Sequence, residues 1–376
     1  MDIIYLDNSA TTKIKTEVLN EMMPYLTTEY GNASSLYSVG RKAKRAIEKA
    51  RGQVAELVNC NSHEIYFTGS GSESDNTALK GFAYANKEKG NHIITSKIEH
   101  HAILETCETL ERQGFEVSYI NVDENGVIKI EELENAIRPS TILISVMTAN
   151  NEIGTIQPIE EISRIAHSRN IVFHTDAVQA IGNMSIDVGK MGIDMLSLSG
   201  HKINAPKGIG ALYIKNGVKV EKYINGGHQE RNQRAGTENV AGIVGLGKAC
   251  ELSNKNMDTH IRNLRKLRDY YLTKLQKEMP QKIRINGSME NRLPGNANVS
   301  FEGVDASELI FKLDEKGICV SSGSACSSGS TTPSHVLTAI NVPEQYLNSA
   351  IRMTFGDSNT FEQVDYLVRI IKNLVK

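Results

Sequence analysis

The sequence contains no uninterrupted apolar stretch of the roughly 18 residues that a membrane-spanning helix needs. It also has no large excess of charge of either sign, because 42 Lys and Arg residues face 44 Asp and Glu residues, for a formal net charge of −2. A chain without a basic surplus is a poor match for a protein that coats nucleic acid or a membrane surface. We therefore expect no direct nucleic-acid partner and no membrane partner.

Cysteine is scarce, with five residues that are widely spread and never form a CxxC pair. This pattern excludes a disulfide framework and a zinc knuckle, and it favours a reducing compartment. The first residues, MDIIYLDNSATTK, show no basic region followed by an apolar stretch, so no secretory signal is expected. The sequence predicts a cytoplasmic protein in which an important cysteine acts as a thiol.

The first two thirds of the chain alternate short β-branched runs with helical stretches, which is typical of a mostly parallel sheet covered by helices. Seven strands are predicted, at Glu64–Thr68, His92–Thr95, Glu116–Ile120, Ile142–Met147, Ile171–Thr175, Met195–Ser199 and Gly210–Ile214. Helices are predicted at Lys42–Val58, Ser72–Lys89, His101–Gln113, Ile159–Arg169 and Val240–Ser253.

A length of 376 residues exceeds what one small core uses, so we expect two domains. The predicted large domain covers residues 14–256, and the smaller α+β domain combines residues 1–13 with residues 257–376. The charged, helical stretch Asn254–Leu275 would lead the chain into the smaller domain. Its further predicted elements are strands near Ala297–Phe301 and Ala350–Phe355, a helix near Ala306–Lys316, and a closing amphipathic helix from Phe361 to Leu374.

A glycine-rich turn, GSGSESDN from Gly69 to Asn76, joins a predicted strand to a predicted helix. Free backbone N–H groups and the positive end of a helix dipole suit a phosphate group. The turn lacks both the GK[ST] of a nucleotide P-loop and the GxGxxG spacing, which disfavours ATP and dinucleotides. Taken alone it also has an ordinary explanation, with Ser72 as the helix N-cap and Glu73 and Asp75 complementing the dipole.

Polar residues end two other predicted strands. Asp176 follows one strand, and Ser199, His201 and Lys202 follow the next. Sites in open α/β sheets lie at the carboxyl ends of strands, so these residues are expected to meet beside the glycine-rich turn. A phosphate cradle, an acid and a lysine together indicate pyridoxal 5′-phosphate: the lysine would hold it as a Schiff base, and the acid would keep its ring nitrogen protonated. Individually, Lys202 could be a solvated lysine with Lys207 as a rival, and Asp176 could cap a short helix.

Nine segments resemble, in the same order, the cysteine desulfurases of the NifS/IscS type, within the aminotransferase-class-V branch of fold-type-I pyridoxal-phosphate enzymes. The segments are YLDNSATT (5–12), YGNASS (30–35), FTGSGSESDN (67–76), EHHAI (99–103), ANNEIGTIQP (149–158), HTDAVQAIG (174–182), SLSGHK (197–202), RAGTEN (234–239) and SSGSACSSGS (321–330). The resemblance spans nearly the whole chain. It implies an α/β fold-type-I transferase whose large domain holds the seven-stranded sheet.

The resemblance also implies roles for single residues. Lys202 would hold the cofactor, Asp176 would pair with the pyridinium nitrogen, and Gln179 would contact the ring hydroxyl. His100 would stack on the ring and move protons, although by itself it could be a surface histidine beside His101. The implied phosphate ligands are Gly71, Ser72, Ser199, His201 and, from the neighbouring subunit of a homodimer, Thr237.

Two residues are implied to hold the carboxylate of the substrate, Asn151 and Arg352, the latter through its bidentate fork. Asn151 also belongs to the implied cofactor site. Arg352 could alternatively be an edge-strand surface cation. No metal is expected in the resting enzyme, although Cys326 could transiently bind an iron–sulfur cluster.

Cys326 separates the possible activities, because an aminotransferase needs no thiol. A desulfurase needs a thiolate that attacks the substrate's sulfur, and the Ser- and Gly-rich loop 321–330 would let Cys326 reach both the cofactor and a sulfur acceptor. Cys60, Cys107 and Cys250 are expected to be core residues, and Cys319 to lie in a strand.

The expected function is the conversion of L-cysteine to L-alanine, with the sulfur left as a persulfide on Cys326. The acceptor would be an iron–sulfur scaffold protein or a tRNA-thiolation enzyme, and the end of the chain at Lys376, without the docking tail of some relatives, leaves this choice open. A selenocysteine lyase, a class-V aminotransferase and an inactive scaffold are the alternatives.

Overall fold

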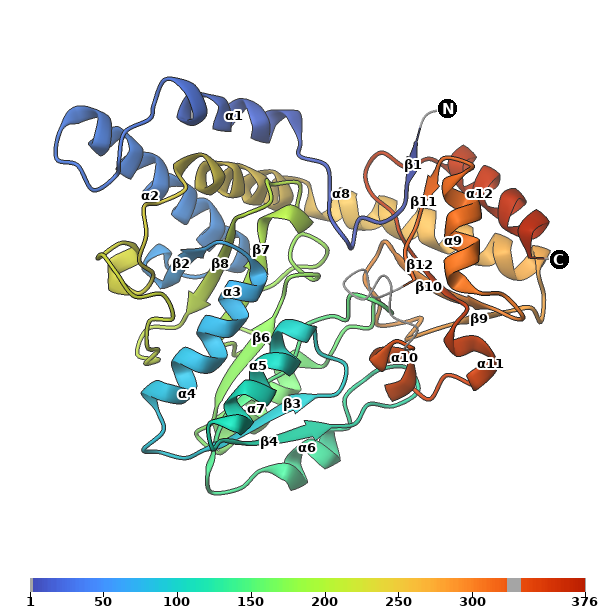
Figure 1. Ribbon diagram of the computed structural model, residues 1–376, viewed down its shortest axis with the longest axis horizontal. Coiled ribbons are helices and arrows are strands. Elements are labelled where there is room, and N and C mark those ends of the chain that lie inside the picture. Colours follow the sequence, from blue (N-terminus) through green and yellow to red (C-terminus); the bar gives the residue numbers. More distant parts are fainter. Residues whose placement is uncertain (1–2, 323–332, 376) are drawn as a thin grey trace.

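The computed structural model describes residues 3–322 and 333–375, and it places them around two main hydrophobic cores that one long helix connects (Figure 1). The larger part is built on a seven-stranded sheet with the order β2-β8-β7-β6-β5-β3-β4. β8 runs antiparallel to both of its neighbours, and the other pairs are parallel. The strands are β2 (Ile65–Thr68), β3 (His92–Ser96), β4 (Glu116–Ile120), β5 (Thr141–Ser145), β6 (Val172–Asp176), β7 (Met195–Ser199) and β8 (Gly210–Ile214). The predicted seven-stranded, mostly parallel sheet is confirmed.

The central strands have apolar sequences because helices cover both faces of the sheet. Successive side chains of a strand point to opposite faces. Ile94 and Ile144 accordingly join the core beneath α2, α7 and α8, whereas Ile93 and Leu143 join the core beneath α4 and α5. The helices of this part are α1 (Thr16–Thr27), α2 (Ser38–Val58), α3 (Gly71–Asn76), α4 (Phe82–Ala85), α5 (His101–Arg112), α6 (Ile130–Ala136), α7 (Ile159–Ser168) and α8 (Val240–Glu278).

Several helices differ from the prediction, among them α6, which was not predicted. The predicted helix Ser72–Lys89 ends at Ala85, and the π-helix Thr77–Gly81 lies between α3 and α4. The chain leaves the helix at Asn86, whose side-chain amide donates to the carbonyls of Phe82 and Lys219. α1 was not predicted. α8 is a single helix of 39 residues that runs without a break through the predicted domain boundary between residues 256 and 257, so that boundary stays a prediction.

The smaller part surrounds the antiparallel sheet β12-β10-β9, which packs against the far end of α8, α9 and α12. The N-terminal segment joins this part, because β1 pairs with β11 and the backbone of Leu6 exchanges hydrogen bonds with Cys319 and Thr354. The elements are β1 (Ile4–Tyr5), β9 (Ile283–Ile285), β10 (Asn296–Phe301), α9 (Ala306–Asp314), β11 (Ile318–Cys319), α10 (His335–Ala339), α11 (Glu344–Leu347), β12 (Ala350–Thr354) and α12 (Phe361–Leu374).

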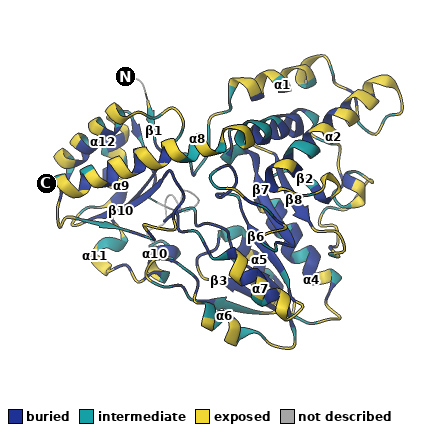
Figure 2. Ribbon diagram, turned by 180° about the vertical axis from the view of Figure 1, so that it is seen from behind, coloured by how far each residue is buried: buried dark blue, intermediate teal, exposed yellow. Residues whose placement is uncertain are grey.

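Burial follows this arrangement: the central sheet is dark blue in Figure 2, whereas the outer sides of α1 and α12 are yellow. Cys107 and Cys250 are fully buried in the cores as predicted, Cys60 is half-buried at the end of α2, and Cys319 lies in β11. Across residues 3–322 and 333–375, every helix is too short or too polar to cross a membrane.

Candidate active site

A cavity of about 550 Å³ lies at the carboxyl ends of the central strands. The segments that follow β2, β3, β5, β6 and β7 all contribute to its wall, so residues far apart in sequence meet here, as expected for an open α/β sheet. The wall includes ten residues singled out from the sequence: Gly71, Ser72, His100, Asn151, Asp176, Gln179, Ser199, His201, Lys202 and Arg352. We call this space the Lys202 cavity.

The glycine-rich turn forms one corner of the Lys202 cavity. Ser70 is the N-cap of α3, and its hydroxyl accepts the N–H of Glu73 at 3.1 Å, so the interpretation of Ser72 as the N-cap is wrong. A Cβ atom on Gly71 would lie only 2.7 Å from Cγ2 of Val178, a clash that leaves glycine as the residue that fits. The backbone at this corner can therefore approach a ligand closely.

Two polar residues after β7 face the same corner. Ser199 is buried as the last residue of the strand. His201 is half-buried, with Nδ1 lying 3.1 Å from the hydroxyl of Thr11, and burial lowers its pKa to about 4. At neutral pH the His201 ring is uncharged and retains one N–H donor.

Lys202 lies in a short turn of 3₁₀ helix directly after β7. Its ammonium group donates hydrogen bonds to the backbone carbonyls of Ser9 and Ala10, the latter at 2.9 Å. The amide of Gln179 donates to the same Ser9 carbonyl at 2.9 Å. The N-terminal segment thus holds Lys202 beside the strand ends, while its rival Lys207 is exposed.

Asp176 forms the buried floor of the Lys202 cavity. One carboxylate oxygen accepts the N–H of Val178 at 2.8 Å, and no helix starts in the turns that follow, so its interpretation as a helix cap is wrong. Burial raises the pKa of Asp176, and the neighbouring His100 and Lys202 oppose this effect. His100 caps α5 through Nδ1, and burial lowers its pKa. Because His100 lines the cavity, its interpretation as a surface histidine is also wrong.

Arg352 reaches the Lys202 cavity from β12 of the smaller part. Its side chain is 2% exposed, so the alternative of a surface cation is wrong. Nη2 lies 2.7 Å from the carboxylate of Asp7, and Nη1 lies 3.3 Å from the carbonyl oxygen of Asn151. These contacts fix the guanidinium at the border between the two parts of the molecule.

Several acidic residues of this wall were missed by the sequence analysis. Glu99 and Glu152 line the cavity, and Asp7 orients Arg352. Asp75 was interpreted as a complement to the helix dipole, but it is 1% exposed and faces the cavity, so that interpretation is wrong. All four lie within the segments that resemble the family. In the sequence, only their positions next to other predicted site residues could have indicated that they belong to the site.

One predicted site residue lies elsewhere, and another is not among the described residues. Thr237 lines a separate small cavity with Arg234, Glu230 and the start of α8. Cys326 lies outside the described residues, as does most of the loop 321–330.

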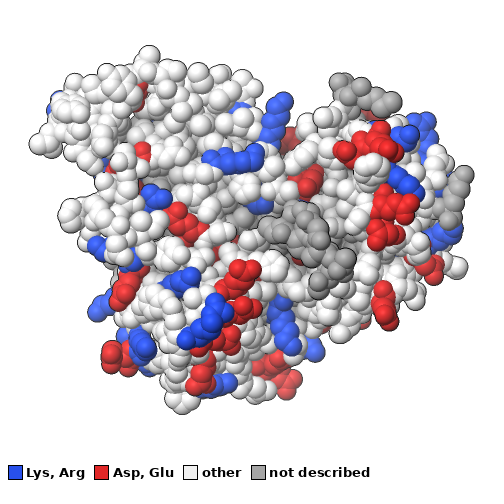
Figure 3. Space-filling model, in the orientation of Figure 1, with Lys and Arg blue, Asp and Glu red and all other residues white. Residues whose placement is uncertain are grey.

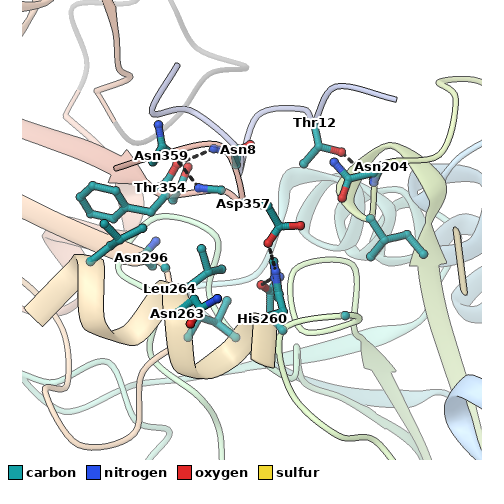
Figure 4. Close-up of a pocket in the computed structure, with 18 of the residues that line it drawn as sticks. Asn8, Thr12, Asn204, His260, Asn263, Leu264, Asn296, Thr354, Asp357 and Asn359 are labelled. Carbon is teal, nitrogen blue, oxygen red and sulfur yellow. Dashed lines mark hydrogen bonds and ion pairs between the residues drawn. The ribbon is translucent and has the colours of Figure 1, made fainter. Parts of the chain in front are cut away.

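A second cavity, of about 570 Å³, lies on the other side of Lys202, between the N-terminal segment, α8 and the turn after β12 (Figure 4). We call it the His260 cavity. It shares Ser9, Gln179 and Lys202 with the first cavity. Asparagine is the commonest of its other polar residues, and one of its acids has two basic partners: the Asp357 carboxylate lies 2.5 Å from Nδ1 of His260 and 2.9 Å from Nζ of Lys15.

Comparison with known proteins gives consistent results. Residues 4–367 match the family model described as aminotransferase class-V. A relative from Clostridium botulinum (strain Hall), named cysteine desulfurase IscS, is 52% identical over 375 residues, which cover 99% of this chain and 94% of the relative. Among solved structures, a NifS-like protein matches with a TM-score of 0.93 and 38% identity, covering 99% of both chains. A structure described as SspA in complex with cysteine matches with a TM-score of 0.83 and 38% identity, covering 95% of this chain and all of that one.

Proposed function

The chain belongs to the aminotransferase class-V family, and we propose that within this family it is a pyridoxal-phosphate-dependent cysteine desulfurase. One observation carries the proposal: an acid, a histidine, a lysine and an arginine from four separate segments line a single cavity. The full-length relatives named cysteine desulfurase, and the similar structure that contains cysteine, support L-cysteine as the substrate.

The residues of the Lys202 cavity fit the cofactor. Gly71, whose position cannot take a Cβ without a clash with Val178, lines the cavity with backbone that could approach a phosphate, and neutral His201 offers an N–H donor in the same cavity. Lys202 would hold the aldehyde carbon of the cofactor, and Asp176 would pair with its ring nitrogen. When bound, pyridoxal phosphate withdraws electrons from the α-carbon of an amino acid.

The remaining cofactor contacts are assigned in the same way. Ser72 and Ser199 would complete the phosphate site, Gln179 and Asn151 would contact the ring substituents, and His100 would lie against the ring face. Because burial lowers the pKa of His100, its ring is neutral at pH 7 and can accept a proton as well as donate one.

Arg352 and Asn151 would hold the carboxylate of L-cysteine. The Arg352 guanidinium is buried and already fixed by Asp7, so little side-chain entropy is lost when a carboxylate binds. A fixed fork also sets the orientation of the substrate, which places its amino group and sulfur at defined positions.

Cys326 is the proposed sulfur acceptor. Its thiolate would attack Sγ of the substrate, so that an S–S bond forms, the Cβ–Sγ bond breaks and the former Cβ becomes the methyl group of L-alanine. The four cysteines that the structure describes are poor thiolates, because burial raises the pKa of each, to about 12 for Cys60. This comparison supports Cys326 by elimination among the five cysteines.

A homodimer is part of the proposal, with Thr237 completing the phosphate site of the second subunit. Two observations support it. Thr237 lies outside the Lys202 cavity of its own chain. In addition, α1 and the loop after it expose apolar side chains over a mostly uncharged part of the surface (Figure 3), namely Leu19, Met23, Leu26, Tyr30, Leu36 and Tyr37. Sedimentation of the purified protein tests the dimer.

The direct test supplies the purified protein with L-cysteine and a reductant. Sulfide and alanine should appear in equal amounts. Cys326→Ala should lose sulfide release and still bind the cofactor, whereas the matched variant Cys319→Ala should retain activity. Amino transfer that depends on a keto acid would contradict the proposal and identify an aminotransferase.

The sulfur is proposed to pass to an iron–sulfur scaffold protein or otherwise to a tRNA-thiolation enzyme. Labelled sulfur on Cys326 should transfer to the true acceptor and not to an unrelated protein that carries a thiol. The cytoplasm is the proposed location, which fractionation of cells would test.

A further inference from the structure

One buried carboxyl in the wall of the Lys202 cavity has no part in the function proposed above. Asp75 lies on α3, is 1% exposed, and forms a hydrogen bond with the hydroxyl of Ser197 on β7. Its other oxygen, Oδ1, has no hydrogen-bond partner among the residues that the structure describes. A buried carboxylate with an unsatisfied oxygen costs much more free energy than a neutral carboxylic acid in the same place.

Asp75 lies next to the acid of the proposed cofactor site. An oxygen of Asp75, an oxygen of Asp176 and a ring nitrogen of His100 all lie within 4.8 Å of one another. Two carboxyl groups this close, both shielded from water, cannot both be ionised without strong repulsion. The pair is therefore expected to carry one negative charge.

The surroundings decide which member carries it. Asp176 accepts the backbone N–H of Val178 and lies near the positive charge of Lys202. Asp75 has neither contact. The nearest basic group is His174, whose Nε2 lies 3.9 Å from Asp75 Oδ1.

His174 brings no positive charge to Asp75. Its two ring nitrogens already interact with the hydroxyls of Ser145, at 2.9 Å, and Ser197, at 3.1 Å. Burial lowers the pKa of His174 to about 3 and raises that of nearby Glu99 to about 8, so both groups are neutral at pH 7.

We propose that Asp75 is a positioning residue that remains a neutral acid and thereby confines the single charge of the pair to Asp176, where it faces the cavity. This inference rests on the proposed function, because the charge on Asp176 is what would keep the cofactor's ring nitrogen protonated. In agreement with it, burial and the charge of Asp176 both raise the pKa of Asp75.

The pH dependence of stability tests the location of the charge. An unfolded Asp loses its proton near pH 3.9, whereas Asp75 retains its proton to a higher pH in the folded chain. Stability is therefore lost as the pH rises between these two values. Asp75→Asn removes this loss. Asp176→Asn does not, because Asp75 then remains as a buried acid without a cation.

The experiment compares melting temperatures at pH 5.5 and pH 8.5 for the full-length chain freed of cofactor. From pH 5.5 to pH 8.5, the melting temperatures of the wild type and of Asp176→Asn should each fall by about 3 °C or more relative to the change in Asp75→Asn. Asp194→Asn is the matched control. Asp194 is a buried acid that is ion-paired with Lys215 at 3.0 Å, so this substitution should lower the melting temperature at both pH values.

Cofactor binding supplies the second readout. Asp75→Asn should bind pyridoxal phosphate within about threefold of the wild-type Kd, and Asp176→Asn should bind it at least about tenfold more weakly. If Asp176→Asn removed the fall in melting temperature with rising pH and Asp75→Asn did not, the charge of the pair would lie on Asp75 and the inference would be overturned. Stabilisation of the wild type by zinc or manganese, absent in Asp75→Asn, would assign these groups to a cation and also overturn it. The melting experiment needs no cofactor, so it remains decisive if the proposed function fails.

Discussion

The two cavities that meet at Lys202 are similar in volume, but the pKa values of their carboxyl groups are shifted in opposite directions. In the Lys202 cavity Asp75, Glu99 and Asp176 are buried, and burial raises the pKa of each. In the His260 cavity the hydrogen bond from His260 holds the pKa of Asp357 far below its usual range, and the ammonium group of Lys15 lowers it further. Buried acids whose ionised form is disfavoured cost stability, so they indicate a site kept for chemistry, whereas acids that a neighbouring basic group stabilises indicate a site kept for structure.

The largest expected difference between the cavities is in catalysis. Lys202→Ala should lower kcat by about 10²–10⁴-fold, because the variant loses the amine that is proposed to hold the cofactor and to move protons. The ammonium of Lys15 belongs to the His260 cavity alone, so Lys15→Ala should retain kcat within about threefold. Steady-state kinetics with L-cysteine measures both. Equal losses in the two variants would show that the cavities do not differ in function.

Arg352→Lys should have the next largest effect. Lysine cannot reproduce the fork that Asp7 and the Asn151 carbonyl hold in place, so KM for L-cysteine should rise by about 10- to 100-fold. The matched variant Arg268→Lys changes another buried arginine, which bonds to Asp269 and to the carbonyl of Leu293. It should affect stability and leave KM unchanged; a rise in KM there would indicate a general loss of structure.

Much of the Lys202 cavity could be predicted because its residues lie at the ends of recognisable strands. β7, from Met195 to Ser199, has an apolar sequence because both of its faces are buried, and Lys202 follows it directly. Asp75 could not be placed in this way. Within a helix it has the sequence pattern of a dipole complement, and its partner Ser197 lies on a distant strand that only the folded chain brings close.

The His260 cavity could not be predicted at all. It forms where the N-terminal segment, α8 and the turn after β12 meet, and each of these segments is ordinary by itself. α1 was missed for a related reason. Its apolar residues Leu19, Met23 and Leu26 are exposed, although Val18 and Met22 are buried, and Pro24 lies inside it, so the sequence shows neither a clear apolar stripe nor an uninterrupted helical pattern.

Glu99→Gln should reveal the cost of an incompletely compensated acid near the Lys202 cavity. Burial raises the pKa of Glu99 to about 8, although Ser96 and the N–H of Met147 donate hydrogen bonds to it. An acid with a raised pKa loses stability as the pH rises from about 4.3, the unfolded value, toward 8. At pH 8.5 the glutamine variant should therefore be more stable by about 1–3 kcal/mol.

Urea unfolding at pH 5 and pH 8.5 measures this effect, with Glu230→Gln as the control. Glu230 is buried as well, but both of its oxygens bond to Arg51, at 2.6 and 2.7 Å. Glu230→Gln should lower stability at both pH values. If both variants were more stable than the wild type, burial alone would decide whether the substitution stabilises the fold, and the arginine partner that Glu230 has would not matter.

Asp357→Asn in the His260 cavity should have the smallest effect and the opposite pH dependence. The pKa of Asp357 is lowered chiefly by His260, so its contribution is present above the unfolded pKa near 3.9 and is lost as the pH falls below it. About half of the Asp357 side chain is exposed, so solvent screening limits the contribution to about 0.2–1 kcal/mol at pH 7.

Urea unfolding of the wild type, Asp357→Asn, Lys15→Met and the double variant isolates the coupling between the charges of Asp357 and Lys15. That coupling should shrink in 1 M salt, because exposed ion pairs are screened, whereas the gain from Glu99→Gln should persist there. A salt-independent coupling above about 1 kcal/mol would show that the His260 cavity shields its charges as strongly as the Lys202 cavity does, and the contrast between the two would no longer hold.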